Sequence, residues 1–153
     1  MTGQRHDLGA TLVRLGRAVV AAEEPVLAEL GVPMWDYVVL VALRDGPVAS
    51  QAQLAASVGR DTTRLIPILD RLAERDLLRR RPDPADRRNR IVELTDDGVR
   101  LTRRCQEAIR RMEERLLAEL PPDDRAEFIR RLERVAELIV GGPGAAERGG
   151  GGG

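Results

Sequence analysis

The sequence predicts one mainly helical (α+β) domain that contains a single two-stranded hairpin. Apolar residues recur at helical spacing along most of the 153 residues, charged residues make up 33% of the chain, and aromatic residues only 2%. This composition is typical of long, solvated helices around a core of Leu, Val, Ile and Ala. Near the middle of the chain the apolar spacing changes to alternation, which favours short strands.

Two helices are expected in the N-terminal third. Six apolar residues at alternating steps of four and three predict the first, namely Leu8, Leu12, Leu15, Val19, Ala22 and Val26. Pro25 lies within this stripe and is expected to kink or divide the helix. A second helix is expected from Trp35 to Leu43, between breaks at residues 31–33 and 45–47.

Two short helices joined by a tight turn are expected next. Ser50, followed three residues later by Gln53, is a capping-box pattern that predicts a helix start. Gly59 suits the left-handed backbone position just after a helix, and Asp61 is expected to cap the following one. Leu65, Leu69 and Leu72 are its predicted buried residues. Together the pair predicts a helix-turn-helix.

A hairpin and two further helices complete the expected order. Residues 78–82 and 90–94 predict the strands, with residues 83–89 as the connecting loop. Thr95 is expected to cap a long helix, and Pro121-Pro122-Asp123 separates it from the last one. The whole order is that of a winged helix-turn-helix flanked by helices from both ends of the chain.

Positive charge is concentrated in one stretch, although the chain has a formal net charge of zero. Residues 60–90 contain ten arginines and six acids, which gives this segment a charge of +4. There is no lysine, so all 25 basic residues are arginine. A locally basic segment is typical of proteins that bind polyanions.

The predicted fold indicates that this basic segment binds duplex DNA. The second helix of a helix-turn-helix enters the major groove, and a hairpin directly after it can lie along the minor groove. We expect base contacts from Asp61, Thr62, Thr63 and Arg64, and wing contacts from Arg87, Arg88 and Arg90, with Asp86 orienting a neighbouring guanidinium. We expect contacts to the DNA backbone from Ser50, Gln51 and Arg60. The alternatives are a merely solvated loop, and threonines that serve only to start the helix.

Other functions find little support. One Cys and one His cannot supply a metal site, and no glycine-rich phosphate loop is present, so no enzyme, cofactor or metal is expected. Cys105 lies on an apolar helix face, where a thiol is usually inert, and no role is expected for His6. Because neither a membrane-spanning run nor a signal peptide is found, we expect a cytoplasmic, nucleoid-associated protein without a membrane partner.

Residues 50–98 resemble the MarR family of bacterial transcriptional regulators. An Asp-Pro-x-Asp-Arg-Arg run occupies residues 83–88, and a Leu-Thr-x-x-Gly run occupies residues 94–98. A Leu-Asp-Arg-Leu segment at residues 69–72 precedes both. The resemblance is close over residues 34–100, and the order of helices extends it to about residue 140.

The resemblance implies a homodimer that binds a pseudo-palindromic operator, usually as a repressor. It implies an N-terminal dimerisation helix (1–33), a winged DNA-binding domain (34–98), C-terminal dimerisation helices (99–140) and a disordered glycine-rich tail (141–153). The apolar stripes of the flanking helices support a dimer independently, because a small winged domain cannot cover them. The resemblance also implies a small phenolic or other lipophilic effector, with Trp35 lining its pocket or, alternatively, belonging to the core.

Two residues depart from the family pattern. Asp76 stands where a glycine usually ends the recognition helix, and Asp tolerates left-handed backbone better than most residues. Pro67 removes one hydrogen bond within that helix, which is expected to bend there or start loosely. The competing function is a winged-helix module for protein interaction or assembly, without specific DNA binding.

Overall fold

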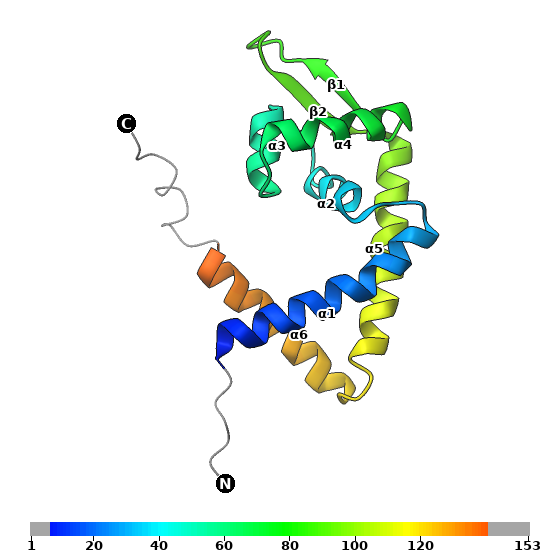
Figure 1. The fold of residues 1–153 in the computed structure, drawn as a ribbon, viewed down its shortest axis with the longest axis vertical. Coiled ribbons are helices and arrows are strands. Elements are labelled where there is room, and N and C mark those ends of the chain that lie inside the picture. Colours follow the sequence, from blue (N-terminus) through cyan, green and yellow to red (C-terminus); the bar gives the residue numbers. More distant parts are fainter. Residues whose placement is uncertain (1–6, 141–153) are drawn as a thin grey trace. The chain divides into compact units, whose positions relative to one another are not determined.

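A computed structural model describes residues 7–140 of the chain, and Figure 1 shows its elements. The elements are α1 (Leu8–Glu29), α2 (Met34–Ala42), α3 (Gln51–Ser57), α4 (Thr62–Glu74), β1 (Leu78–Pro82), β2 (Arg90–Leu94), α5 (Asp96–Leu116) and α6 (Pro122–Val140). The predicted mainly helical (α+β) class and the order of elements are confirmed. The chain forms two compact units, one up to Glu113 and one from Glu114 onward, and each is described by itself. His6 and the glycine-rich segment 141–153 lie outside the described residues.

The first helix is continuous through its proline. Asp7 caps α1 by accepting a hydrogen bond from the backbone N–H of Gly9 at 2.8 Å. Pro25 does not divide the helix, contrary to one of the two outcomes expected from the sequence. The turn around it is held by tertiary packing, because Leu27 is fully buried and Val26 packs against the core. α1 and α2 then meet at a bend of 91°.

The helix-turn-helix is organised by the predicted caps. The Ser50 hydroxyl accepts a hydrogen bond from the backbone N–H of Gln53 at 3.1 Å, which starts α3. Gly59 has a φ of +67°, the left-handed conformation expected just after a helix. Asp61 caps α4 by accepting from the backbone N–H of Arg64 at 2.9 Å. These contacts fix the direction in which α4 leaves the turn.

The core of this unit is aliphatic and lies where α2, α3 and α4 meet. The predicted residues Leu65, Leu69 and Leu72 on α4 are all fully buried. Removing one such side chain from water contributes about 1.5–3 kcal/mol to stability. Pro67 does not break α4. Its ring removes one backbone N–H donor, the one that would bond to the carbonyl of the exposed residue Thr63. The helix starts with a formed cap rather than loosely.

A buried ion pair joins α2 to α4. The Asp36 carboxylate is fully buried and accepts two hydrogen bonds from the guanidinium of Arg71, one of them from Nε at 3.1 Å. Asp36 also lies in the first turn of α2, where the helix dipole favours negative charge. Removing Arg71 would leave the buried Asp36 charge without compensation, so the pair fixes α4 against α2.

The junction between α4 and the hairpin requires left-handed backbone and close packing. Asp76 has a φ of +54°, as expected for a residue in the position of the usual glycine. The Thr95 hydroxyl donates to the Asp76 carbonyl at 2.6 Å and accepts from the Gly98 N–H at 3.0 Å. A Cβ added to Gly98 would lie 1.9 Å from the Leu77 carbonyl oxygen, so this position has no room for a side chain.

The hairpin has the strand boundaries that the sequence predicted. β1 and β2 pair antiparallel, with Leu78 opposite Leu94 and Pro82 opposite Arg90. Val48 extends this two-stranded sheet by an isolated bridge to Val92, through hydrogen bonds of 2.9 and 3.0 Å, which the sequence analysis did not anticipate. In Figure 1 the hairpin lies on the side of α4 that faces away from α2.

The last two helices differ in burial. In the first unit, α5 buries one face, which carries Thr102, Cys105, Ile109 and Met112. In the second unit, α6 begins with Pro122 and buries none of its residues. Its apolar residues Phe128, Ile129, Leu132, Val135, Leu138 and Ile139 are exposed. No single helix within residues 7–140 is long and apolar enough to cross a membrane; α1 and α2 meet such a criterion only when taken together across their bend.

Candidate nucleic-acid interface

The residues predicted to read bases form the capped first turn of α4. Thr62, Thr63 and Arg64 are exposed there, and Asp61 precedes them as the cap. Asp61 also lies 3.5 Å from Nε of Arg64, so this acid orients the arginine in addition to closing the helix. Asp61 therefore caps α4 and positions Arg64. Contact with bases stays a prediction for all four residues.

The hairpin separates its arginines onto two faces. Arg79 and Arg81 both pair with Glu93, at 2.7 and 3.3 Å. The hydrogen bond from Arg79 is the main reason why the pKa of Glu93 lies below its usual value. Because alternate residues of a strand point to opposite faces, Arg80 lies on the other side, where Asp70 accepts from its guanidinium at 2.6 Å. The base of the wing is thus largely neutralised.

The tip of the wing keeps its positive charge. Arg87, Arg88 and Arg90 are exposed, and within residues 7–140 none of them forms an ion pair. Asp86 was expected to hold a neighbouring guanidinium, but its side chain instead accepts from the backbone N–H of Arg88 at 3.0 Å. Asp83 accepts from the backbone N–H of Ala85 in the same way. These short acids stabilise the turns of the loop and so position the arginines indirectly.

The three predicted contacts to the DNA backbone have different surroundings. Ser50 caps α3, and the side-chain oxygen of Gln51 accepts from Arg80 at 3.4 Å. The guanidinium of Arg60 stacks on the Trp35 ring at 3.5 Å. The structure brings Gln51 and Arg90 together with Arg80 around a hollow of about 330 Å³. Arg80 was missed from the sequence, although the strand register places it on this face.

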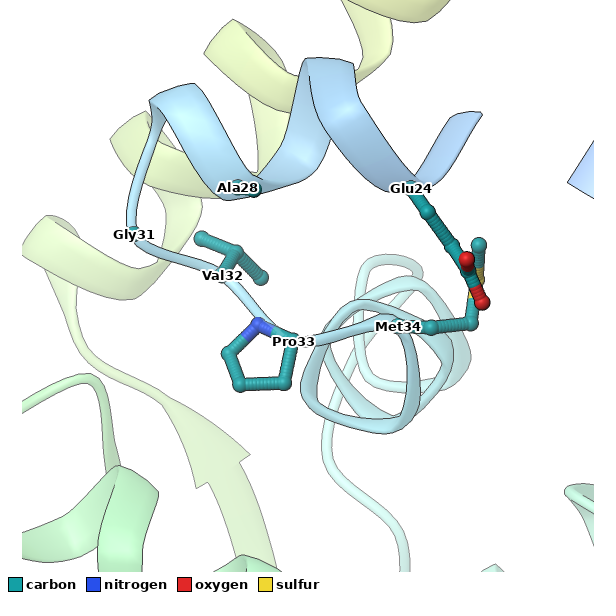
Figure 2. Close-up of a pocket in the computed structure, with 6 residues that line it drawn as sticks. All are labelled: Glu24, Ala28, Gly31, Val32, Pro33 and Met34. Carbon is teal, nitrogen blue, oxygen red and sulfur yellow. The ribbon is translucent and has the colours of Figure 1, made fainter. Parts of the chain in front are cut away.

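A second hollow, of about 400 Å³, lies at the junction of α1 and α2. Figure 2 shows the Glu24 side chain reaching from α1 toward that of Met34, with Val32 and Pro33 along the connecting segment. Trp35, the predicted pocket residue, is not among the lining residues; its ring stacks against Arg60 instead. The hollow is mostly apolar, and its one charged group is the Glu24 carboxylate.

Cys105 remains a buried thiol. It is fully buried on α5, and burial raises the pKa of its thiol above the usual value. A protonated, enclosed thiol is a poor nucleophile, which agrees with the expectation that this residue is inert.

Comparison with known sequences identifies the family. A sequence model of the MarR family matches residues 33–89, which include α2, α3, α4 and β1. The chain belongs to the MarR family. MarR-family proteins are transcriptional regulators rather than enzymes, in agreement with the prediction that the chain has no catalytic activity.

Among curated proteins, the chain is similar to the HTH-type transcriptional repressor NicR of Pseudomonas putida. The two are 34% identical over 101 residues, which are 66% of this chain and 64% of NicR. The match therefore spans less than two thirds of the length of NicR.

Solved structures share the fold over most of their length. CouR from Rhodococcus jostii, bound to a 23-mer DNA duplex, has a TM-score of 0.73 at 29% identity, covering 85% of this chain and 92% of CouR. PcaV from Streptomyces coelicolor, in complex with its natural ligand, has a TM-score of 0.63 at 31% identity, covering 88% of this chain and 97% of PcaV. CouR has also been solved with p-coumaroyl-CoA.

Proposed function

We propose that this MarR-family chain is a homodimeric, sequence-specific DNA-binding repressor that is released from its operator by a small effector. The observation that carries the proposal is the charge distribution of the wing. The arginines at the base of the hairpin pair with internal acids, whereas Arg87, Arg88 and Arg90 remain exposed near its tip without such partners among residues 7–140. Arginine suits this position because its planar guanidinium group binds phosphates and enters a narrow, electronegative minor groove.

The first turn of α4 would supply the major-groove contacts. Arg64 can make a bidentate contact to guanine, and the methyl groups of Thr62 and Thr63 can contact thymine. Ser50, Gln51 and Arg60 would contact the DNA backbone. The structure of CouR bound to a 23-mer DNA duplex supports DNA binding by a chain of this fold.

A homodimer is proposed because both flanking helices carry exposed apolar side chains. Leu8, Leu12 and Leu15 are exposed on α1, and α6 has no buried residue at all. Surfaces of this kind are typical of obligate dimer interfaces. A two-fold axis would place two recognition helices about 34–36 Å apart, one turn of the duplex.

The hollow between α1 and α2 is the proposed effector site. Its apolar lining suits an aromatic ring packed on Val32, Pro33 and Met34, with a hydroxyl that donates to the Glu24 carboxylate. The ligand-bound structures of PcaV and CouR support an effector for this family. A neutral phenol fits this lining better than a carboxylate would.

Duplex affinity, measured by fluorescence anisotropy as a function of salt, tests DNA binding. We expect log K to fall with log salt at a slope of about −0.9 per neutralised phosphate. Arg88→Ala should weaken binding by about 1–3 kcal/mol and leave the dimer intact by ultracentrifugation. Arg100→Ala, which removes an exposed arginine that pairs with Asp97 at the start of α5, is the control outside the wing. Affinity that stays flat with salt would favour the competing function, a protein-interaction module.

A further inference from the structure

We propose that the hollow lined by Gln51, Arg80 and Arg90 seats one phosphodiester of the DNA backbone, with Arg80 as its central ligand. The hollow measures about 330 Å³ and lies between the start of α3 and the inner face of the hairpin. This inference rests on the proposed DNA binding. It adds Arg80, at the base of the wing, to the contacts already proposed for Gln51 and Arg90.

The strand register places both arginines on one face. Arg80 is opposite Val92, and Pro82 is opposite Arg90, so these four residues share a side of the ribbon. Val92 is fully buried, which shows that this side faces the helix-turn-helix. The paired arginines Arg79 and Arg81 point to the other side, toward Glu93.

Arg80 is held in position before any ligand binds. Asp70 of α4 accepts from one terminal nitrogen at 2.6 Å, and Gln51 of α3 accepts from the other at 3.4 Å. A guanidinium has five N–H donors, so donors remain for an incoming anion. Because the side chain is already ordered, binding costs less conformational entropy than at a mobile surface arginine.

The charges and donors of the hollow match one phosphodiester. Two guanidinium groups and the Asp70 carboxylate leave a charge of +1, equal and opposite to one backbone phosphate. The oxygen of Gln51 is engaged by Arg80, so its amide NH₂ is left to donate.

A matched pair of variants tests the seat. Arg80→Gln and Arg79→Gln remove the same charge from adjacent residues on opposite faces of β1. Binding to a mixed-sequence, fluorescein-labelled duplex of about two and a half turns is titrated between about 50 and 200 mM salt. Arg80→Gln should lower the slope of log K against log salt by about 0.9, so that its loss of affinity over this range is about 3.5-fold smaller than in the unsubstituted protein. Arg79→Gln should keep the full slope.

The outcomes separate this proposal from the proposed function. Absence of salt-dependent duplex binding by the unsubstituted protein would contradict DNA binding itself. A steep slope there, with equal slopes for the two variants, would overturn the seat alone. Arg80→Lys, which keeps the charge, should restore the slope, and circular dichroism checks that each variant is folded.

Free phosphate is the other source of the same chemistry. Thermal unfolding of the DNA-free protein is compared in inorganic phosphate and in sodium chloride at equal ionic strength. If phosphate stabilises the unsubstituted protein but not Arg80→Gln, while both bind the duplex with the same slope, the hollow holds free phosphate and the assignment to DNA is wrong. The phosphodiester is supported if the unsubstituted protein unfolds at the same temperature in phosphate and in sodium chloride, and if Arg80→Gln shows the expected lower slope of log K against log salt.

Discussion

The guanidinium of Arg60 lies 3.5 Å from the centre of the Trp35 ring and joins the turn before α4 to the start of α2. Nε of Arg60 is buried and has no hydrogen-bond partner in the described part of the chain. The ring is therefore the main partner of this cation. The contact links two residues to which the sequence assigned separate roles, one at the DNA and one at the effector.

A double-mutant cycle should reveal this coupling. We expect Arg60→Ala and Trp35→Leu each to lower the free energy of unfolding, and the double variant to lose about 0.5–1 kcal/mol less than the sum. Urea unfolding of the four proteins measures the coupling. Strict additivity would mean that the stacking does not contribute to stability.

Gly98→Ala should destabilise the protein by about 1–3 kcal/mol, because the new methyl group would overlap the backbone carbonyl of Leu77.

Asp76→Gly, in the same junction, should have the opposite effect and stabilise by about 0.5–1 kcal/mol, since glycine adopts a positive φ without strain. Both changes in the free energy of unfolding can be measured in urea. A neutral Gly98→Ala would show that the junction opens easily.

We expect the free energy of unfolding to fall as the pH rises from 4.5 through the raised folded-state pKa of Glu23. Burial, and then the nearby Glu113 carboxylate, raise the pKa of Glu23 above 4.5. The folded protein therefore binds this proton more tightly than the unfolded chain, and the stabilisation present below pH 4.5 is lost as the pH rises through the folded-state pKa. Glu23→Gln should increase the free energy of unfolding at neutral pH and have little effect near pH 4.5.

Glu29→Gln, an exposed substitution near the end of the same helix, is the control for that experiment. Urea unfolding at the two pH values compares the variants. A pH response of Glu23→Gln that equals the response of Glu29→Gln would contradict the burial of Glu23 as its cause.

The charge of Glu24 should govern the choice of effector. We expect p-cresol to release DNA at a lower concentration than p-toluate, because like charges about 4 Å apart cost about 1 kcal/mol in water, or roughly fivefold in affinity. Glu24→Gln should remove most of this difference. Competition against a labelled duplex gives both values, and a preference for p-toluate that survives in Glu24→Gln would place the ligand elsewhere.

Local signals in the sequence predicted most of the fold. The strand boundaries at residues 78–82 and 90–94 follow from alternation, and the caps Ser50 and Asp61 follow from side-chain chemistry within three residues. The left-handed Asp76 also follows, because the family pattern places a glycine there. Each of these features depends on neighbours along the chain.

Contacts between distant residues could not be predicted in the same way. Asp36 lies in an otherwise apolar segment, and its partner Arg71 is 35 residues away. The stacking of Arg60 on Trp35, and the hollow shared by Gln51, Arg80 and Arg90, likewise depend on how helices and hairpin pack together. Of these, only the side of the ribbon occupied by Arg80 was accessible from the sequence, because Arg80 lies two residues after the apolar Leu78 on the same strand.

The unburied α6 has a consequence for regulation. If a second subunit covers its apolar residues, the species competent for DNA forms by association of two chains, and mass action applies. Below the dissociation constant of that pair, and while the operator is far from saturated, operator occupancy rises with the square of the chain concentration. Half the concentration of chains would then give about one quarter of the occupancy, a steep dependence set by one helix.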